Sequence, residues 1–478
     1  MHKTKIIATL GPATDDIEVL REAVRAGMNV ARFNFSHGDH ATTAERLRKL
    51  RLVCKEEGCT VAALADTKGP EIRLGCFEDG KAELESGAIF RLMTEECLGN
   101  REQAFITYQD LPGDVAVGTA ILLNDGQIEL VVEEVLEKEI ITRVVSGGTI
   151  SDRKGVNVPS TNLNMPFISE RDYKDIKFSV EQGFDFVAAS FTRNREDVLA
   201  IRRLLKELGG EKMLIIAKIE NSEGVEKIRE IVEATDGIMV ARGDLGVEMP
   251  LEDIPTLQKR LIRFGFEQGK IVVTATQMLE SMISASKPTR AEVSDVANAI
   301  YDGTSAIMLS GESAVGKYPV ESIRMMDVIA EHTEKAIDYK ERFHTSTYRR
   351  NASVVNAISV ATVTTAHELG ATAILTVSLS GNTARNVAKY RPACPIIVCS
   401  TEPMVVRQMS MVWGVKPLLM EWQSTTDALF EQAIALAQRQ SGLVDGDVLV
   451  ITAGVPLGQS GTTNLLKVHV VGQSAKLM

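Results

Sequence analysis

Eight short apolar segments recur along the chain, and each of them ends in polar or small residues. They span residues 5–11, 28–36, 61–68, 184–190, 213–220, 237–244, 270–277 and 306–312. Most are separated by stretches with apolar residues at three- and four-residue spacing, for example 17–26, 44–57 and 196–208, and this spacing predicts amphipathic helices. Alternating strands and helices predict a parallel sheet. Strands that are apolar throughout predict burial on both faces.

Eight such units predict an α/β protein built on a closed (β/α)8 barrel, the TIM-barrel class. An open doubly wound sheet is the alternative, but its polar strand ends would gather at a single switch point. Here nearly every strand has a polar end. In a barrel these ends lie together at the carboxyl-terminal rim, where such folds carry their chemistry.

Two further regions depart from this alternation. Within residues 69–165, short alternating segments such as 120–124 and 128–135 are divided by turns containing Gly and Asp, which predicts a small inserted β-barrel domain. Because it follows a barrel strand, we expect it to stand above the rim and act as a lid. Later strand-like and helix-like segments predict a C-terminal α/β regulatory domain. The expected division is barrel residues 1–68 and 166–338, lid residues 69–165 and C-terminal residues 339–478.

Composition limits the possible partners. The 478 residues carry a net charge of −11 with a pI near 5.4, so the chain as a whole repels nucleic acids and anionic membranes. No apolar segment has the length needed to span a bilayer, and the N-terminus lacks the apolar core of a signal peptide. The six cysteines include no C-x-x-C pair, which indicates reduced thiols. We therefore expect a cytoplasmic protein with no nucleic-acid or membrane partner.

The strand ends carry candidate catalytic groups. Lys218 and Glu220 lie two residues apart and therefore point to the same face, while Asp244 ends the following strand. Two carboxylates from adjacent strands can share one Mg²⁺, which takes one or two protein carboxylates together with substrate oxygens. A Lys–Glu–Asp ion-pair cluster is the structural alternative, and these residues alone do not decide between the two.

A second set of polar residues follows the early strands. Arg32, Asn34 and Ser36 alternate with apolar residues and share one face. Neutral oxygens together with Asp66 suit a monovalent cation, and Arg32 suits a phosphate; a hydrogen-bonded network is the alternative. The segment 66–73 surrounds a Gly-Pro turn at the start of the insertion. It is either a hinge with solvated charges or a hinge that contributes Asp66 and Arg73 to the site.

Taken together, these segments resemble the pyruvate kinase family over essentially the whole chain. The similar motifs are long and occur in the family's order: residues 34–38 (NFSHG), 66–73 (DTKGPEIR), 154–157 (KGVN), 214–225 (LIIAKIENSEGV), 239–248 (MVARGDLGVE), 275–282 (ATQMLESM), 287–292 (KPTRAE) and 308–312 (MLSGE). The resemblance implies transfer of the phosphoryl group of phosphoenolpyruvate to ADP, giving pyruvate and ATP in glycolysis.

The resemblance also implies the role of each site residue. Lys218 neutralises the transferring phosphoryl group and the enolate, and Arg32 grips the phosphate. Glu220 and Asp244 bind Mg²⁺ or Mn²⁺. The substrate carboxylate is held by Thr276 with the backbone of Gly243 and Asp244, and Thr276 and Ser310 lie near the route of enolate protonation. Potassium is bound by Asn34, Ser36, Asp66 and the Thr67 carbonyl, and the nucleotide phosphates by Arg73 and Lys154.

The remaining implications concern regulation. Glu71 stands where K⁺-independent members of the family tend to carry Lys, so the resemblance implies K⁺ dependence. Residues 378–383 (SLSGNT) resemble the family's loop for a phosphorylated allosteric effector, through Ser378, Ser380, Gly381, Asn382 and Thr383; a strand-to-helix turn capped by Ser380 is the alternative. A homotetramer is implied as well. The chain is expected to lack the extra C-terminal phosphate-transfer-like domain of some bacterial members.

Two other functions remain as alternatives. A metal-dependent aldolase or lyase acting on a pyruvate enolate would share Lys218, Glu220 and Asp244, but it would need neither the nucleotide-facing Arg73 and Lys154 nor a lid. A metabolite-binding regulator without turnover would be expected to have lost at least one residue of the set Lys218, Glu220, Asp244 and Thr276. All four are present.

Overall fold

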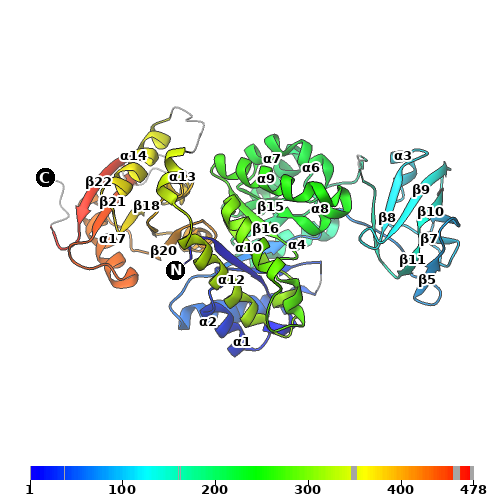
Figure 1. Ribbon diagram of the computed structural model, residues 1–478, viewed down its shortest axis with the longest axis horizontal. Helices are drawn as coiled ribbons and strands as arrows, with labels where there is room; N and C mark the ends of the chain where they lie inside the picture. The colour runs from blue at the N-terminus through cyan, green and yellow to red at the C-terminus, as the bar shows by residue number, and fades with distance from the viewer. Residues whose placement is uncertain are drawn as a thin grey trace.

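The computed structural model describes residues 2–36, 38–159, 161, 163–345, 353–455 and 463–473. Its centre is a closed barrel of eight parallel strands, in the order β1-β17-β16-β15-β14-β13-β3-β2 (Figure 1). This confirms the predicted (β/α)8 barrel. The strands are β1 (Lys5–Thr9), β2 (Val30–Asn34), β3 (Ala62–Asp66), β13 (Phe186–Ala189), β14 (Leu214–Ile219), β15 (Gly237–Ala241), β16 (Ile271–Ala275) and β17 (Ala306–Leu309).

Each barrel strand is shorter than its apolar segment predicted, because its last residues turn away from the sheet at the rim. The interior is filled by side chains such as Ile7, Leu64, Phe186, Ile216 and Met239, all fully buried. The barrel is thus a packed core that exposes chemistry only at its ends.

Helices surround the barrel, and polar caps fix where they begin. Thr289 caps α10 through the backbone N–H of Glu292, whose carboxylate accepts the Thr289 N–H in return, a capping box. Ser169 and Asp172 do the same at α4. The helical elements are α1 (Ile17–Arg25), α2 (His40–Glu56), α4 (Glu170–Glu181), α5 (Arg195–Glu207), α6 (Ser222–Glu226), α7 (Ile228–Ala234), α8 (Arg242–Glu248), α9 (Ile254–Glu267), α10 (Arg290–Asp302), α11 (Gly311–Ala314) and α12 (Pro319–Lys335), with short 3-10 turns η1 (Pro12–Thr14), η2 (Leu251–Asp253) and η3 (Glu280–Ile283).

The chain leaves the barrel after β3, forms a β domain and returns through α4; this domain projects from one side of the barrel (Figure 1). It was expected as a small β-barrel. In the described residues it is a seven-stranded sheet, β4-β12-β8-β9-β10-β6-β7, with a separate two-stranded ribbon, β11-β5. The two ends of the sheet meet, because the Gly75 N–H donates to the Phe105 carbonyl and the Thr107 N–H to the Arg73 carbonyl, so the sheet closes as the expected small barrel. Its elements are β4 (Ile72–Arg73), β5 (Lys81–Leu84), β6 (Ile89–Met93), β7 (Gln103–Phe105), α3 (Leu111–Asp114), β8 (Ala120–Leu123), β9 (Ile128–Val135), β10 (Glu139–Ser146), β11 (Gly148–Ser151) and β12 (Gly155–Asn157).

A C-terminal α/β domain lies against the barrel on the side away from the insertion (Figure 1). Its sheet has the order β20-β19-β18-β21-β22, with only β22 antiparallel. Arg407 of this domain donates to Asp185 of the barrel, which is fully buried, over 2.7 Å. The elements are α13 (Tyr339–Thr345), α14 (Val354–Glu368), β18 (Ala373–Val377), α15 (Asn382–Ala388), β19 (Ile396–Ser400), α16 (Pro403–Met409), β20 (Val415–Leu419), α17 (Thr426–Ser441), β21 (Val448–Gly454) and β22 (Thr463–Val470). No helix in the described ranges has the length and apolar character needed to cross a membrane.

Lys5 lies where the barrel meets this domain, and its burial makes the stability of the fold depend on pH. Its Nζ donates to the Val415 carbonyl over 2.8 Å. Burial lowers the pKa of Lys5 to about 8, and Glu334 offsets only part of this effect. The unfolded chain therefore binds more protons than the folded chain between pH 8 and 10.5, so stability rises with pH in that window.

We expect the rise contributed by Lys5 to be about 3 kcal/mol. Melting temperatures of wild type and Lys5→Met, measured from pH 7 to 10.5, should therefore diverge as the pH increases, with the wild type gaining relative to the variant. The matched control is Lys212→Met, at an exposed lysine, which should track the wild type. Parallel curves for wild type and Lys5→Met would contradict the prediction.

Candidate active site

A buried lysine forms the centre of the site at the carboxyl-terminal rim of the barrel. The Nζ of Lys218 lies 2.9 Å from Glu220 Oε1 and 3.2 Å from Asp66 Oδ1, and it donates to Ser190 Oγ over 2.7 Å. Lys218 belongs to β14, Asp66 ends β3, and Ser190 follows β13. Closure of the barrel brings these three strand ends together, as the shared face of Lys218 and Glu220 had predicted in part.

The charges of this cluster are nearly, but not fully, compensated. Burial alone would lower the pKa of Lys218, but Asp66 and Glu220 outweigh it and hold this pKa above its usual value. Burial also raises the pKa of Glu220 to about 7, with Asp244 adding to the effect and Lys218 opposing it. A carboxylate with a raised pKa beside a second carboxylate favours a bound cation.

Arg32 extends the cluster toward β1 and β2. Its Nε donates to Asp66 Oδ2 over 2.6 Å, and an Nη donates to Thr9 Oγ1 over 2.9 Å. Asp66 is therefore shared by two cations. Burial would raise the pKa of Asp66, but Lys218 and Arg32 outweigh it and hold this pKa below its usual value.

The four residues predicted to bind K⁺ come from two neighbouring strand ends. Asn34 ends β2 and pairs in register with Asp66. The Oδ1 of Asn34 accepts the Ser36 N–H over 3.0 Å, and the Thr67 carbonyl accepts from Ser190 Oγ over 2.7 Å. Oxygen atoms of four chemical kinds thus lie in one part of the rim, which is a donor set that suits a hard cation.

Thr276 and Gly243 follow β16 and β15 and are joined directly. The Gly243 N–H donates to Thr276 Oγ1 over 2.9 Å. Thr276 has φ of +69°, a conformation that costs a non-glycine residue of order 1–3 kcal/mol and often marks a functional site. Ser310 follows β17, and its buried Oγ has no hydrogen-bond partner in the described structure. Such an orphaned hydroxyl is available to a ligand.

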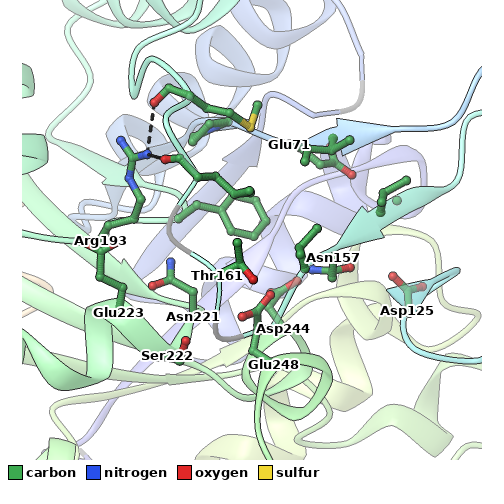
Figure 2. A pocket seen from close by; sticks show the side chains of 18 residues that line it. Glu71, Asp125, Asn157, Thr161, Arg193, Asn221, Ser222, Glu223, Asp244 and Glu248 are labelled. Carbon is green, nitrogen blue, oxygen red and sulfur yellow. Dashed lines mark hydrogen bonds between the residues drawn. The ribbon is translucent and has the colours of Figure 1, made fainter. Parts of the chain in front are cut away.

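A cleft of about 120 Å³, open to solvent, separates the barrel rim from the inserted domain. Figure 2 shows Asp244 and Glu248 from the barrel, with Glu71, Asp125 and Asn157 from the insertion, around it. The carboxylate of Asp244, in helix α8, has no hydrogen-bond partner among the described residues, so it remains available to a ligand. Among the described residues, no group of three or more His, Cys, Asp or Glu side chains forms a metal cluster by itself, so a divalent ion here would need oxygens from a substrate.

The predicted nucleotide-binding residues are near the cleft but do not line it. Arg73 on β4 pairs with Gly155, the first residue of β12, and Lys154 directly precedes that strand. The guanidinium of Arg73 instead contacts Glu71, with its Nε 2.9 Å from Oε2, and the Arg153 carbonyl. To reach a ligand in the cleft, these side chains or the insertion would have to move.

The predicted effector loop lies far from the rim along the fold, between β18 and α15 of the C-terminal domain. Ser378, Ser380 and Gly381 lie on this connection, and Asn382 and Thr383 begin α15. Arg385 donates to the Ser380 carbonyl and to Asn382 Oδ1, and Thr383 Oγ1 lies 2.8 Å from Thr463 Oγ1.

Sequence reasoning missed three groups that organise the site. Ser190 contacts Lys218, Asp66 and the Thr67 carbonyl. The N–H of Phe191, at φ +54°, donates to Glu220 Oε2 over 2.6 Å. Glu312, fully buried, accepts the Ser310 N–H over 2.7 Å. A small polar residue at the end of an apolar strand was the available signal for Ser190; the backbone conformation of Phe191 has no such signal.

Gly69 supports this arrangement from the hinge to the insertion. It has φ of +72°, and a Cβ atom there would lie 2.9 Å from both the Cβ and the carbonyl oxygen of Ser190. We expect Gly69→Ala to displace Ser190 and with it Lys218, lowering kcat/KM by roughly 10–100-fold. The matched control is Gly58→Ala, where φ is +62° and no atom lies within 4 Å. Equal activities of the two variants would show that backbone strain, not the contact with Ser190, matters.

Fold and site together define a barrel enzyme with a lysine–carboxylate cluster under an inserted domain. Comparison with known proteins gives the family. The family model "Pyruvate kinase, barrel domain" matches residues 1–323, and "Pyruvate kinase, alpha/beta domain" matches residues 356–469. The chain belongs to the pyruvate kinase family, and it is a phosphotransferase.

Individual relatives are similar over nearly the whole chain. It is 49% identical to a pyruvate kinase of Geobacillus stearothermophilus over 472 residues, which cover 98% of this chain and 80% of the relative. It is 47% identical to that of Sporosarcina psychrophila, covering 99% and 81%. A crystal structure of a pyruvate kinase from Cryptosporidium parvum superimposes with a TM-score of 0.93 at 39% identity, covering 98% of this chain and 96% of that one.

Proposed function

We propose that this chain transfers the phosphoryl group of phosphoenolpyruvate to ADP in glycolysis, with Mg²⁺ (or Mn²⁺) and K⁺ as cofactors. The observation that carries the proposal is the position of Lys218. Its ammonium group is buried and held charged by Asp66 and Glu220. Asp244, which lines the cleft beneath the insertion, also acts on it electrostatically. Phosphoryl transfer needs positioning and positive charge more than covalent chemistry from the protein.

The donor set fits a divalent ion between Glu220 and Asp244. Burial raises the pKa of the Glu220 carboxyl group, and the Asp244 carboxylate has no hydrogen-bond partner among the described residues. A bound cation would compensate the negative charge of both groups. When bound, Mg²⁺ would neutralise charge on the substrate and phosphoryl oxygens. The two proposed carboxylates, Glu220 and Asp244, match the one or two that Mg²⁺ usually takes when it also binds a phosphate.

The side chains of the cluster have separate roles in binding the substrate and stabilising its charge. In this proposal Arg32 donates to the phosphoryl oxygens and Lys218 to the oxygen that becomes the enolate, because both bear charge that grows during transfer. Asp66 orients both cations. The substrate carboxylate accepts from Thr276 and from the backbone N–H groups of Gly243 and Asp244.

Protonation of the enolate completes the reaction. We assign the proton route to Thr276 and Ser310, since the Ser310 hydroxyl is buried without a partner and Thr276 lies at the adjacent strand end. Arg73 and Lys154 bind the nucleotide phosphates once the insertion closes as a lid, which also excludes water that would hydrolyse the phosphoryl donor.

Potassium provides a further test of the site. We expect pyruvate formation from phosphoenolpyruvate and ADP, with Mg²⁺, to be more than about tenfold faster in K⁺ than in tetramethylammonium, because Asn34, Ser36, Asp66 and Thr67 would hold a cation that helps bind anionic substrates. Glu71 is ion-paired with Arg73 and Lys68, at 2.9 and 3.6 Å.

Replacing Glu71 with Lys should reduce the K⁺ requirement by supplying a fixed cation, and Glu71→Gln is the control that removes the carboxylate without adding a charge. Turnover that is equal with and without K⁺ in the wild type would contradict the K⁺ assignment. Absence of any pyruvate formation would contradict the proposed function itself.

The proposal extends to the rest of the molecule. The six cysteines are free, as the reducing cytoplasm allows. We propose the loop formed by residues 378–383 as the site of a phosphorylated effector, and a homotetramer as the assembly, both supported by membership of the family.

A further inference from the structure

A second cavity lies at the junction of the barrel and the C-terminal domain. Its barrel wall includes Lys270 and Ile271, at the start of β16, and Ser305, just before β17. It is therefore at the end of the barrel opposite Thr276, which follows the other end of β16. The C-terminal domain contributes α15 and the residues after it, and Figure 1 shows this domain packed against the barrel.

Four cationic side chains line this cavity, and both domains contribute. They are Lys270 from the barrel and Arg385, Lys389 and Arg391 from the C-terminal domain. No ion pair within the described residues joins Lys270, Arg385 or Lys389 to an acid.

The nearby acids are paired elsewhere. Asp236 lies 3.0 Å from Arg202, and Glu267 lies 2.8 Å from Arg263. Positive charge in the cavity thus exceeds the negative charge that the protein supplies.

Some N–H donors of these cations also have no hydrogen-bond partner among the described residues. Lys270 Nζ donates to the Thr235 carbonyl over 2.7 Å. Arg385 donates through one nitrogen to the Ser380 carbonyl and Asn382, while its buried Nη1 has no partner in the described structure.

Burial lowers the pKa of Lys270, Lys389 and Arg385, with Asp236 opposing this for Lys270 and Arg385 and Glu267 for Lys389. Unpaired cations removed from water are costly unless an anion accompanies them.

The shape of the groups favours a phosphate. A guanidinium and two ammonium groups present donors from several directions, which matches the three oxygens and double charge of a phosphate better than the two oxygens and single charge of a carboxylate. The cavity is small, about 20 Å³, and open to solvent, so a phosphate group would reach these donors from the solvent side with any substituent outside.

We propose that this junction cavity binds a phosphate group, either as inorganic phosphate or as part of a phosphomonoester. The site is separate from the loop formed by residues 378–383, none of which lines the cavity. An anion there bridges the two domains, so its binding stabilises their contact by mass action.

The test is a calorimetric titration of the full chain with inorganic phosphate and, separately, with glycerol 3-phosphate. Lys270→Gln and Lys389→Gln should each weaken binding by roughly 10–100-fold, the range for loss of one charged hydrogen bond. The matched control is Lys212→Gln, at a lysine that pairs with Glu402 across the same junction, and it should bind like the wild type. A crystal grown in phosphate should show the anion beside Arg385 and Lys270.

Each outcome decides the proposal. Tighter binding of glycerol 3-phosphate than of phosphate identifies a phosphomonoester as the ligand, and equal or weaker binding identifies inorganic phosphate. Wild-type affinity in both lysine variants would overturn the proposal. Loss of all phosphate binding in Ser380→Ala, with the lysine variants unaffected, would place the anion at the effector loop instead. Because Lys270 and Lys389 lie outside the catalytic cluster, pyruvate formation without added phosphate should be unchanged in both variants.

Discussion

Replacing Lys218 with Met is expected to lower kcat for pyruvate formation by about three to five orders of magnitude, the effect of removing a cation that stabilises a phosphoryl-transfer transition state. The reason is geometric. Lys218 Nζ is the cation that Glu220 and Asp66 hold at 2.9 and 3.2 Å beneath the cleft, and methionine fills its volume without its charge. Steady-state rates at saturating substrates measure the loss.

The fold of this variant should survive. Removing one partner of a buried ion pair can cost 3–5 kcal/mol, but Glu220 already has its pKa raised to about 7. Without Lys218 that pKa rises further, so at neutral pH the carboxyl takes up a proton instead of remaining an unpaired charge. Circular dichroism and melting temperature should therefore stay close to those of the wild type.

Lys5→Met provides a matched control for the Lys218 variant. Lys5 is also buried in the barrel but lies at the opposite end, where it donates to a backbone carbonyl. It should keep wild-type turnover. If Lys218→Met retained activity within about tenfold of the wild type, the central role of Lys218 would be wrong.

The second large effect is expected at the divalent-ion site. Asp244→Asn should raise the Mg²⁺ concentration needed for half-maximal turnover by more than about a hundredfold, since even a residue that only orients a metal ligand contributes roughly 10–100-fold. Asparagine preserves the shape of the side chain and removes the charge. Titration of turnover with Mg²⁺, and direct Mn²⁺ binding followed by electron paramagnetic resonance, measure the change.

Glu220→Gln should act in the same direction with an additional defect. The glutamate accepts on both oxygens, from Lys218 at one and from the Phe191 N–H at the other. A glutamine must turn its NH₂ toward one of these donors, so it loses a hydrogen bond as well as a charge. Glu223→Gln is the control, because Glu223 also lines the cleft but pairs with Lys227 at 2.7 Å. Unchanged Mn²⁺ affinity in both active-site variants would contradict the metal assignment.

The predicted elements and the observed ones differ at their ends. The apolar segment 237–244 predicted a strand with a polar end, whereas β15 stops at Ala241 and Arg242–Glu248 form a helix. Periodicity detects the buried part of a strand, but it cannot locate the residue at which the chain leaves the sheet, because that depends on closure of the barrel rim. The insertion shows the same limit: alternation predicted its strands and their small barrel, but not the separate β11-β5 ribbon.

The sequence by itself determined the barrel, the C-terminal domain and the family. Buried strands, amphipathic helices and long motifs are all recognised from residues that are close together in the sequence. It also placed Lys218 and Glu220 on one face, since a strand has a two-residue period. Only the tertiary structure decided which distant groups meet. Ser190 reaches Lys218 and Asp66 from a third strand, Phe191 turns its N–H to Glu220, and cations of two domains enclose the junction cavity. These contacts join residues far apart in the chain, and their distances follow from how the barrel closes and how the C-terminal domain packs against it.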